Sequence, residues 1–455
     1  MASREYRFAT VAELGRALRC GLVSAAELAE AAHEALSSIG PGLNAVASLL
    51  PERSRAEAER AQRRLRESDA PSPLCGIPYG VKDLYAARGA PTTWGAPSFA
   101  DRVFETDAAV VRRLSRRGGL LAAKLAMVEL AGAGRARIAG ASMHGSGRNP
   151  WDASRYAGGS SSGSAIAVAA GLLPYTLGTE TGGSIVGPAA FCGVTGLRPT
   201  HGLVSRDGAL VISPTLDKPG PLARTADDCA TVLQAIALRP IAVSAEFLPH
   251  VRVAFLEEEF DECAPHTRTA LARAVAELRQ VVPNFVHRGI NRELPYGPTL
   301  ETIMLAESAA ALRPWLEQSD FELVDADQLA ELRRGLQLPA HLYLEAMQAR
   351  DEVVREFARV FDSADVMLTV SRTGTAPPLD QHREQRTTRS MSDTLRAAGN
   401  LAGVPAISFP CGLADDGLPV GLQLIAPRGA DARVLAIVSS YQSRTDHHLR
   451  RPPGL

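Results

Sequence analysis

Three short segments of the sequence carry side chains whose types and spacing could perform acyl transfer. They are "GVKD", which contains Lys82, "GGSSSGS", which begins at Gly158, and "GTETGGSI", which contains Ser184. A serine directly after two glycines can lie on a tight turn with bare backbone N–H groups, because glycine adopts positive φ and lets a ligand approach closely. Acyl transfer needs such donors for the oxygen that becomes negative in the tetrahedral intermediate. We expect this oxyanion hole to consist of the backbone N–H groups of Thr181, Gly182, Gly183 and Ser184.

A serine hydroxyl is a weak nucleophile and needs a group that accepts its proton. Among the ten histidines, His144 and His201 lie nearest the Gly- and Ser-rich segments, but neither lies in a recognisable motif, and "RPTHG" indicates a turn at His201. This disfavours a Ser-His-Asp enzyme. Lys82 is the alternative base, since it ends an apolar stretch where burial could lower its pKa from about 10.4 to roughly 7 or 8.

The serines from Ser160 to Ser162 admit three interpretations: a flexible tether, an anion cradle or a catalytic element. They follow two glycines and run directly into a helix of small residues, "SAIAVAAG", which favours a buried helix start over a tether. The chain has no GxxxxGK[ST] pattern here, so a nucleotide phosphate is disfavoured. A hydroxyl at this position could instead relay a proton between the lysine and the nucleophile.

The surrounding sequence indicates how these segments are positioned. The capping boxes that begin at Thr10 and Ser24 predict two helices within residues 10–38, and a charged helix is predicted over 52–68. A buried strand is expected over 77–81, just before the lysine. From there strands alternate with helices, which is typical of a mostly parallel sheet covered on both faces.

We therefore expect one large α/β domain over residues 1–455. It divides into N-terminal helices over 1–70, a core over 71–235, a helical cover over 245–365 and a C-terminal return to the sheet over 366–455. No internal repeat is visible.

The three segments together, in this order, resemble the amidase signature family of Ser-cisSer-Lys hydrolases. The resemblance begins near Leu74 and includes "PAAFCGVTGLRPT", "LDKPGPLARTADDC", "AAGNLAGVPAISFPCG" and "GLPVGLQLI", so it covers most of the chain. It implies a single large domain whose mixed β-sheet core is sandwiched by α-helices.

The resemblance also assigns roles. Lys82 corresponds to the general base, Ser160 to a bridging serine after a cis Gly159-Ser160 bond, and Ser184 to the nucleophile. Ser161 and Thr181 would orient the bridging serine and the nucleophile loop, whereas the roles of Asp83 and Ser164 stay open. The implied activity is hydrolysis of a carboxylic amide through a serine acyl-enzyme, with no cofactor and no metal.

Two departures from the family bear on the substrate. Most members carry Arg directly after the "GSI" of the nucleophile, where this chain has Val186 and Gly187, so we expect a polar contact beneath the loop to be missing. Residues 368–390, "LTVSRTGTAPPLDQHREQRTTRS", are unusually polar, and if they line the entrance they favour a polar or aromatic amide over a long aliphatic one.

Composition narrows the range of partners. The 49 Lys and Arg residues balance 50 Asp and Glu residues, so no bulk charge points to nucleic acid or an acidic membrane. The six cysteines are scattered without metal-ligand spacing, which favours a reducing, cytoplasmic setting. No signal peptide or membrane-spanning run is recognisable. A small-molecule amide is the expected partner, and a homodimer is left open.

Three other functions stay open at this level. The chain could be the glutaminase (A) subunit of a tRNA-dependent amidotransferase, whose sequences share these motifs. It could be a biosynthetic amidase or acyl-transfer enzyme with one specialised substrate, because the nucleophile does not specify the acyl acceptor. A catalytically silent binding protein is disfavoured, since the lysine and both serines are retained.

Overall fold

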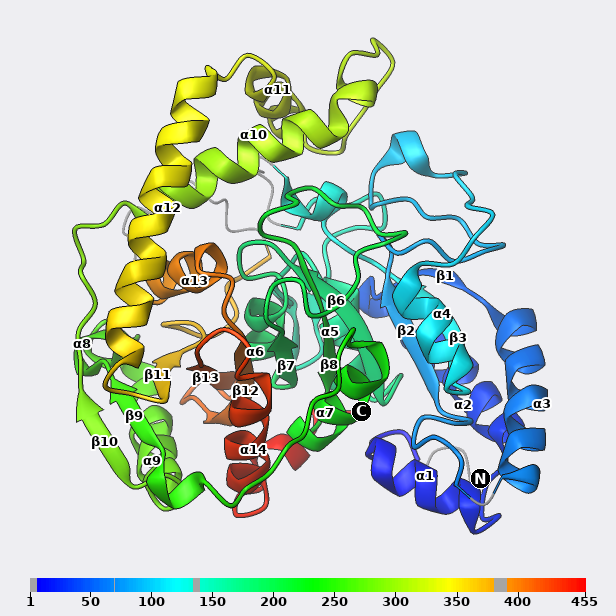
Figure 1. Ribbon diagram of the computed structural model, residues 1–455. Coiled ribbons are helices and arrows are strands. Elements are labelled where there is room, and N and C mark those ends of the chain that lie inside the picture. The colour runs from blue at the N-terminus through cyan, green and yellow to red at the C-terminus, as the bar shows by residue number, and fades with distance from the viewer. Residues whose placement is uncertain (1–5, 69, 134–139, 380–390) are drawn as a thin grey trace.

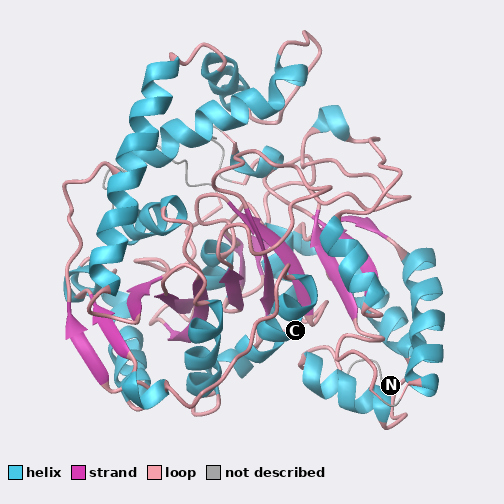
Figure 2. Ribbon diagram, viewed as in Figure 1, coloured by secondary structure: helices cyan, strands magenta, loops and turns pink. Residues whose placement is uncertain are grey.

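A single eleven-stranded sheet forms the centre of the molecule, and helices lie on both sides of it (Figure 2). The computed structural model describes residues 6–68, 70–133, 140–379 and 391–455. The strands follow the order β1-β3-β2-β6-β8-β7-β12-β13-β11-β9-β10 across the sheet. Their bounds are β1 Val46–Leu49, β2 Pro78–Lys82, β3 Leu120–Leu125, β6 Tyr175–Glu180, β7 Thr195–Arg198, β8 Lys218–Ala223, β9 Arg252–Phe255, β10 Asn284–His287, β11 Val366–Val370, β12 Ala406–Leu413 and β13 Pro419–Ile425; a separate two-stranded ribbon pairs β4 Arg148–Asn149 with β5 Asp152–Tyr156.

The predicted α/β fold with a mixed sheet between helices is confirmed, but the expectation of a mostly parallel sheet is wrong. Among the described strands, β2 pairs in parallel with β3 and β6, and β9 pairs in parallel with β10 and β11, whereas the other six pairings of the large sheet are antiparallel. The reason lies in the connections. No α-helix separates β7 from β8 or β12 from β13, and strands joined without a crossover helix pair antiparallel.

Several hydrophobic clusters pack against the sheet, and two of them lie on opposite faces of β8. Leu222 and Ala223 are neighbours on β8 and belong to different clusters, as expected for successive strand residues that point to opposite faces. The first cluster includes Val111, Leu233 and Leu435, from α4, α7 and α14 respectively. The second includes Ala165, Ile166 and Ala189, from α5 and α6. Helices α5 and α6, which follow Ser160 and Ser184 in the sequence, therefore lie packed against the sheet.

The N-terminal helices begin where their capping boxes predict. Thr10 caps α1 and Ser24 caps α2, and in each case the glutamate three residues later bonds back to the cap residue. The charged helix predicted over 52–68 is α3. The bounds of these and the remaining α-helices are α1 Val11–Arg19, α2 Ala25–Ser38, α3 Pro51–Glu67, α4 Ala109–Arg116, α5 Ser162–Ala169, α6 Val186–Cys192, α7 Ala226–Ile236, α8 Glu257–Asp261, α9 Arg268–Arg279, α10 Tyr296–Leu316, α11 Ala326–Gly335, α12 Ala340–Phe361, α13 Met391–Leu401 and α14 Asp431–Gln442.

Residues 245–365 hold more than the predicted helical cover. Helices α10, α11 and α12 lie together at the top of Figure 1, but the same stretch also contributes β9 and β10, which extend the sheet to its far edge. Each of these strands has four residues, too few for an alternating pattern to stand out among charged helices. Within the described part of the chain, no helix combines the length and apolar character needed to cross a membrane.

Candidate active site

Lys82 is the last residue of β2, and its side chain reaches the start of α5. Its Nζ lies 2.7 Å from Ser160 Oγ and 3.0 Å from Thr179 Oγ1. Strand β6, which carries Thr179, pairs with β2 in parallel register, so the two residues reach the same end of neighbouring strands. The sheet thus brings together a lysine and a serine that are 78 residues apart in the sequence.

The ammonium group of Lys82 is fully buried. Burial lowers the pKa of Lys82 to about 7, against the smaller opposing effect of the charges of Asp217 and Glu180. A large fraction of this lysine is therefore neutral near pH 7 and can accept a proton.

The start of α5 is held by hydrogen bonds of the Ser161 side chain and of the Ser161 backbone N–H. The Gly159-Ser160 peptide bond is cis, as the family resemblance implied. Ser161 Oγ accepts from the Thr179 N–H at 3.3 Å and donates to the Thr179 carbonyl at 3.1 Å, while its own N–H donates to the Ser184 carbonyl at 3.3 Å. Ser161 thus joins the segment that contains Ser160 to the segment that contains Ser184, and Ser160 is held next to the lysine.

The loop that carries Ser184 is fixed from below by Glu180. Its carboxylate accepts from the backbone N–H groups of Ile185 at 2.9 Å and Val186 at 3.0 Å. It also accepts hydrogen bonds from the Arg198 guanidinium at 3.0 Å and from the Asn400 side-chain amide at 2.9 Å. Burial alone would raise the pKa of Glu180, but the charge of Arg198 and these hydrogen bonds lower it to about 2. The loop is therefore held by a carboxylate that stays ionised.

Thr181 anchors the other end of the nucleophile loop. Its hydroxyl donates to Asp217 Oδ1 at 2.6 Å, and the second oxygen of Asp217 accepts from the N–H groups of Ile212 and Ser213. Thr181 is buried, whereas Ser184 is half-buried. The segment from Thr181 to Ser184 is therefore held at both ends while its serine remains accessible.

The nucleophile loop does not lack polar support, contrary to the expectation drawn from Val186. Arg396 of α13 donates to the carbonyl of Gly182, and a Cβ at Gly187 would collide with the guanidinium of Arg372. Asp393 lies 3.2 Å from Arg396 and 3.7 Å from Arg372. Arginines from distant segments lie against the loop in a chain that has no arginine after "GSI".

Asp83, Ser164 and His201, which the sequence analysis also considered, each contact other residues in the structure. Asp83 forms a buried ion pair with Lys124 at 2.7 Å and accepts from the Thr93 hydroxyl. Ser164 donates to the Leu177 carbonyl at 3.1 Å. His201 lies in the predicted turn, and its Nε2 is 3.1 Å from the Pro214 carbonyl.

His144 contacts the Thr93 hydroxyl at 3.4 Å, and burial lowers the pKa of its ring. Neither histidine is joined to Ser184 by a contact among the described residues.

The predicted entrance loop is described only as far as residue 379, and residues 380–390 lie outside the described part of the chain. The described part runs alongside β5. The Tyr156 N–H donates to the Pro377 carbonyl at 2.8 Å, and the Leu379 N–H donates to the Ser154 carbonyl at 3.0 Å.

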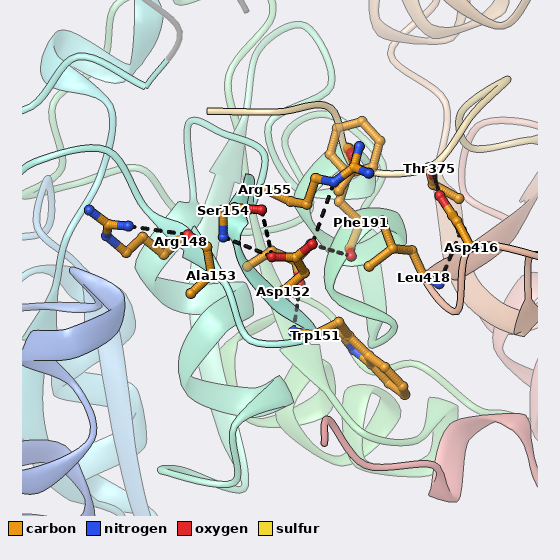
Figure 3. Close-up of polar contacts among 12 residues, drawn as sticks. Arg148, Trp151, Asp152, Ala153, Ser154, Arg155, Phe191, Thr375, Asp416 and Leu418 are labelled. Carbon is orange, nitrogen blue, oxygen red and sulfur yellow. Dashed lines mark hydrogen bonds and ion pairs between the residues drawn. The ribbon is translucent and has the colours of Figure 1, made fainter. Parts of the chain in front are cut away.

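Strand β5 is itself organised around Asp152, as Figure 3 shows. Asp152 accepts from the backbone N–H and the hydroxyl of Ser154 and pairs with Arg155 at 3.6 Å. Nearby, Thr375 donates to Asp416 at 2.7 Å. The base of the predicted entrance loop is thus tied to β5 and to the turn that contains Asp416.

Sequence reasoning did not single out Thr179, Glu180 or Asp217 as parts of the site. Thr179 could have been found, because it lies in "GTETGGSI", the same segment as Thr181 and Ser184. Glu180 and Asp217 give no comparable local signal. Their partners Asn400 and Thr181 lie 220 and 36 residues away.

Among the described residues, no three His, Cys, Asp or Glu side chains gather in a way that could hold a metal ion.

Comparison with known proteins gives a consistent result. The model of the family described as Amidase matches residues 27–435. Among curated proteins, the chain is 34% identical to the A subunit of glutamyl-tRNA(Gln) amidotransferase from Chromohalobacter salexigens, over 97% of this chain and 98% of that protein. It is 35% identical to the protein of the same name from Chloroflexus aggregans, over 98% of this chain and 99% of that protein.

Solved structures resemble the chain over nearly its whole length. The native peptide amidase from Stenotrophomonas maltophilia superposes with a TM-score of 0.82 at 29% identity, covering 98% of each chain. A structure described as an amidase gives a TM-score of 0.83 at 32% identity, covering 96% of this chain and 99% of that one. A protein from a complex linked to the origins of an s-triazine catabolic enzyme gives 0.84 at 28% identity, covering 96% and 98%.

Proposed function

The chain belongs to the amidase signature family of C–N hydrolases, and from this premise we propose that it hydrolyses a carboxylic amide to an acid and ammonia or an amine through an acyl-enzyme on Ser184. One observation carries the proposal: the Nζ of Lys82, buried and with its pKa lowered to about 7, lies 2.7 Å from Ser160 Oγ. A neutral amine in contact with a hydroxyl is the arrangement that a proton relay requires.

In the proposed mechanism, Lys82 takes a proton from Ser160, which takes one from Ser184 as its oxygen attacks the amide carbonyl. The N–H groups from Thr181 to Ser184 stabilise the oxyanion. The relay then returns a proton to the leaving nitrogen, and the C–N bond breaks. Water attacks the acyl-enzyme by the same route, and the acid is released.

A screen of small aryl and alkyl amides, with ammonia or amine release as the readout, tests the proposal. We expect wild type to hydrolyse at least one amide and Ser184→Ala to lose that activity by at least about 10³-fold. Ser164→Ala is the matched control, because Ser164 is a buried serine of α5 whose hydroxyl bonds only the Leu177 carbonyl among the contacts described. Equal activity in wild type and Ser184→Ala would refute the proposed nucleophile.

A second candidate function is favoured by the curated relatives, which carry the name of the A subunit of glutamyl-tRNA(Gln) amidotransferase. In that case the amide would be glutamine, and the chain would act with partner subunits. Ammonia release from glutamine that depends on added partner subunits would support this function over that of a free-standing amidase.

The acyl acceptor is a separate question, because an acyl-enzyme can react with water or with an amine. We propose water. Product analysis with hydroxylamine present would detect transfer: a hydroxamate as the main product at low hydroxylamine concentration would favour a biosynthetic acyl-transfer enzyme.

A further inference from the structure

Arg396 of α13 lies against the glycine pair that precedes Ser184. Its guanidinium donates to the carbonyl of Gly182, and its aliphatic part packs across Gly183, where an added Cβ would collide with it. Gly183 has φ of +114°, which a residue with a side chain rarely adopts. The glycine and the arginine therefore fit each other at this point.

This contact bears on the oxyanion hole through the geometry of the peptide group. The carbonyl of Gly182 and the N–H of Gly183 belong to one planar unit and point in opposite directions. A donor that holds the carbonyl on one side therefore fixes the direction of the N–H on the other. A cation on the carbonyl also polarises the peptide, which strengthens the N–H as a donor.

The arginine is itself held in place. Asp393, one helical turn earlier on α13, lies 3.2 Å from the second terminal nitrogen of Arg396. Arg372 lies 3.7 Å from the same carboxylate oxygen.

We propose that Arg396 is a positioning residue of the reaction: it orients and polarises the Gly182-Gly183 peptide so that the Gly183 N–H serves the oxyanion. This rests on the proposed function, in which Ser184 is the nucleophile. The role concerns the transition state and not the ground state, because the negative oxygen forms only when the carbonyl is attacked.

The test compares Arg396→Met with Arg396→Lys and with the control Arg359→Met. Met keeps the aliphatic packing and removes the donor, and Lys keeps one donor and the charge. For Arg396→Met we expect kcat to fall on the order of 10- to 100-fold with KM changed less than about threefold, since an oxyanion donor would be misplaced and not deleted. Arg396→Lys should recover part of the loss. Arg359→Met removes an arginine of α12 that pairs with Glu356 at 2.6 Å and donates to the Gly289 carbonyl, without touching the Gly182 carbonyl, so its kcat should stay within about threefold of wild type.

The pH profile of kcat distinguishes a positioning role of Arg396 from a general loss of structure in the active site. The fall in rate at low pH should keep the same midpoint in Arg396→Met, because that midpoint reflects Lys82. A raised KM with unchanged kcat would overturn the proposal in favour of substrate binding. Equal losses in Arg359→Met and Arg396→Met would also overturn it.

A fluorophosphonate probe gives a readout that does not depend on the identity of the substrate. Its attack by a serine also places negative charge on an oxygen in the hole, so Ser184 of Arg396→Met should be labelled on the order of tenfold more slowly than wild type. Labelling of both proteins at one rate would overturn this inference alone. Absence of labelling at Ser184 in folded wild type would overturn the proposed function, and this inference with it.

Discussion

Replacement of Lys82 by Met should abolish activity and at the same time change how stability depends on pH. The side chain is fully buried, and burial lowers its pKa from 10.5 to about 7. At pH 7 and below, keeping this group inside the protein costs on the order of 5 kcal/mol relative to the unfolded chain. Met has a similar length and carries no charge, so its burial does not have this free-energy cost. The lysine that the proposed reaction needs therefore destabilises the folded protein.

The sign follows from the two pKa values of the lysine. Between pH 7 and 10.5 the unfolded chain holds the lysine proton and the folded protein does not, so the unfolded state binds more protons and stability rises with pH. Below pH 7 both states are protonated, and the full cost remains. Between pH 7 and 9, wild type should gain about 2 kcal/mol of unfolding free energy relative to Lys82→Met.

Urea unfolding of both proteins at pH 7 and 9 measures this difference, because other titrating groups cancel between them. Activity should fall by about 10² to 10⁴-fold in the variant, and the wild-type rate should rise with pH through a midpoint near 7. Lys218 is the matched control: it is also buried, burial lowers its pKa to about 7, and it donates to the Leu216 carbonyl. Lys218→Met should show a similar pH-dependent stability difference but keep its activity and acid limb.

Two results would refute this reasoning. An unfolding free-energy difference that is the same at pH 7 and 9 would show that Lys82 is not neutral in the folded protein. If the rise of the rate with pH near 7 disappears in Lys218→Met but remains in Lys82→Met, the group whose deprotonation activates the enzyme is Lys218.

Two further substitutions test how the nucleophile loop is held. Glu180→Ala should lower the unfolding free energy by about 3 to 5 kcal/mol in urea, because it leaves the buried Arg198 unpaired, and Glu180→Gln should lose less; no change would mean that the pair does not stabilise the fold. Thr181→Val should cost about 1 to 3 kcal/mol, since Asp217 loses its hydroxyl donor, and should reduce kcat, whereas Thr181→Ser should restore both. Equal kcat in wild type, Thr181→Val and Thr181→Ser would show that Thr181 does not contribute to catalysis.

What the sequence predicts well is local. The starts of α1 and α2 follow from Thr10 and Ser24, because a capping box is complete within four residues. Lys82 at the end of a buried strand follows from a short apolar run bounded by glycine and proline. The sheet's pairing was less predictable, since the short connections that make it mostly antiparallel are not recognised until the neighbouring strands are known.

The residues that hold the site are of another kind. Glu180 contacts Arg198 and Asn400, and Thr181 contacts Asp217, so each support is formed between segments that are remote in the sequence. No periodicity or spacing links such partners. A motif can therefore name the groups that react while leaving unnamed the groups that fix their geometry.

The nucleophile loop shows how a position-by-position comparison fails here. Val186 stands where most of the family has arginine, and taken alone it predicts a lost polar contact. In the structure Arg396 donates to the Gly182 carbonyl from α13, 214 residues away, and Arg372 occupies space that Gly187 leaves open. An arginine within the loop would move with the loop, whereas Arg396 belongs to a separate helix and holds the loop against it. The charge near the glycine pair is thus supplied from outside the motif. From the role proposed for Arg396, we expect variants of α13 to alter catalysis without any change in the motif itself.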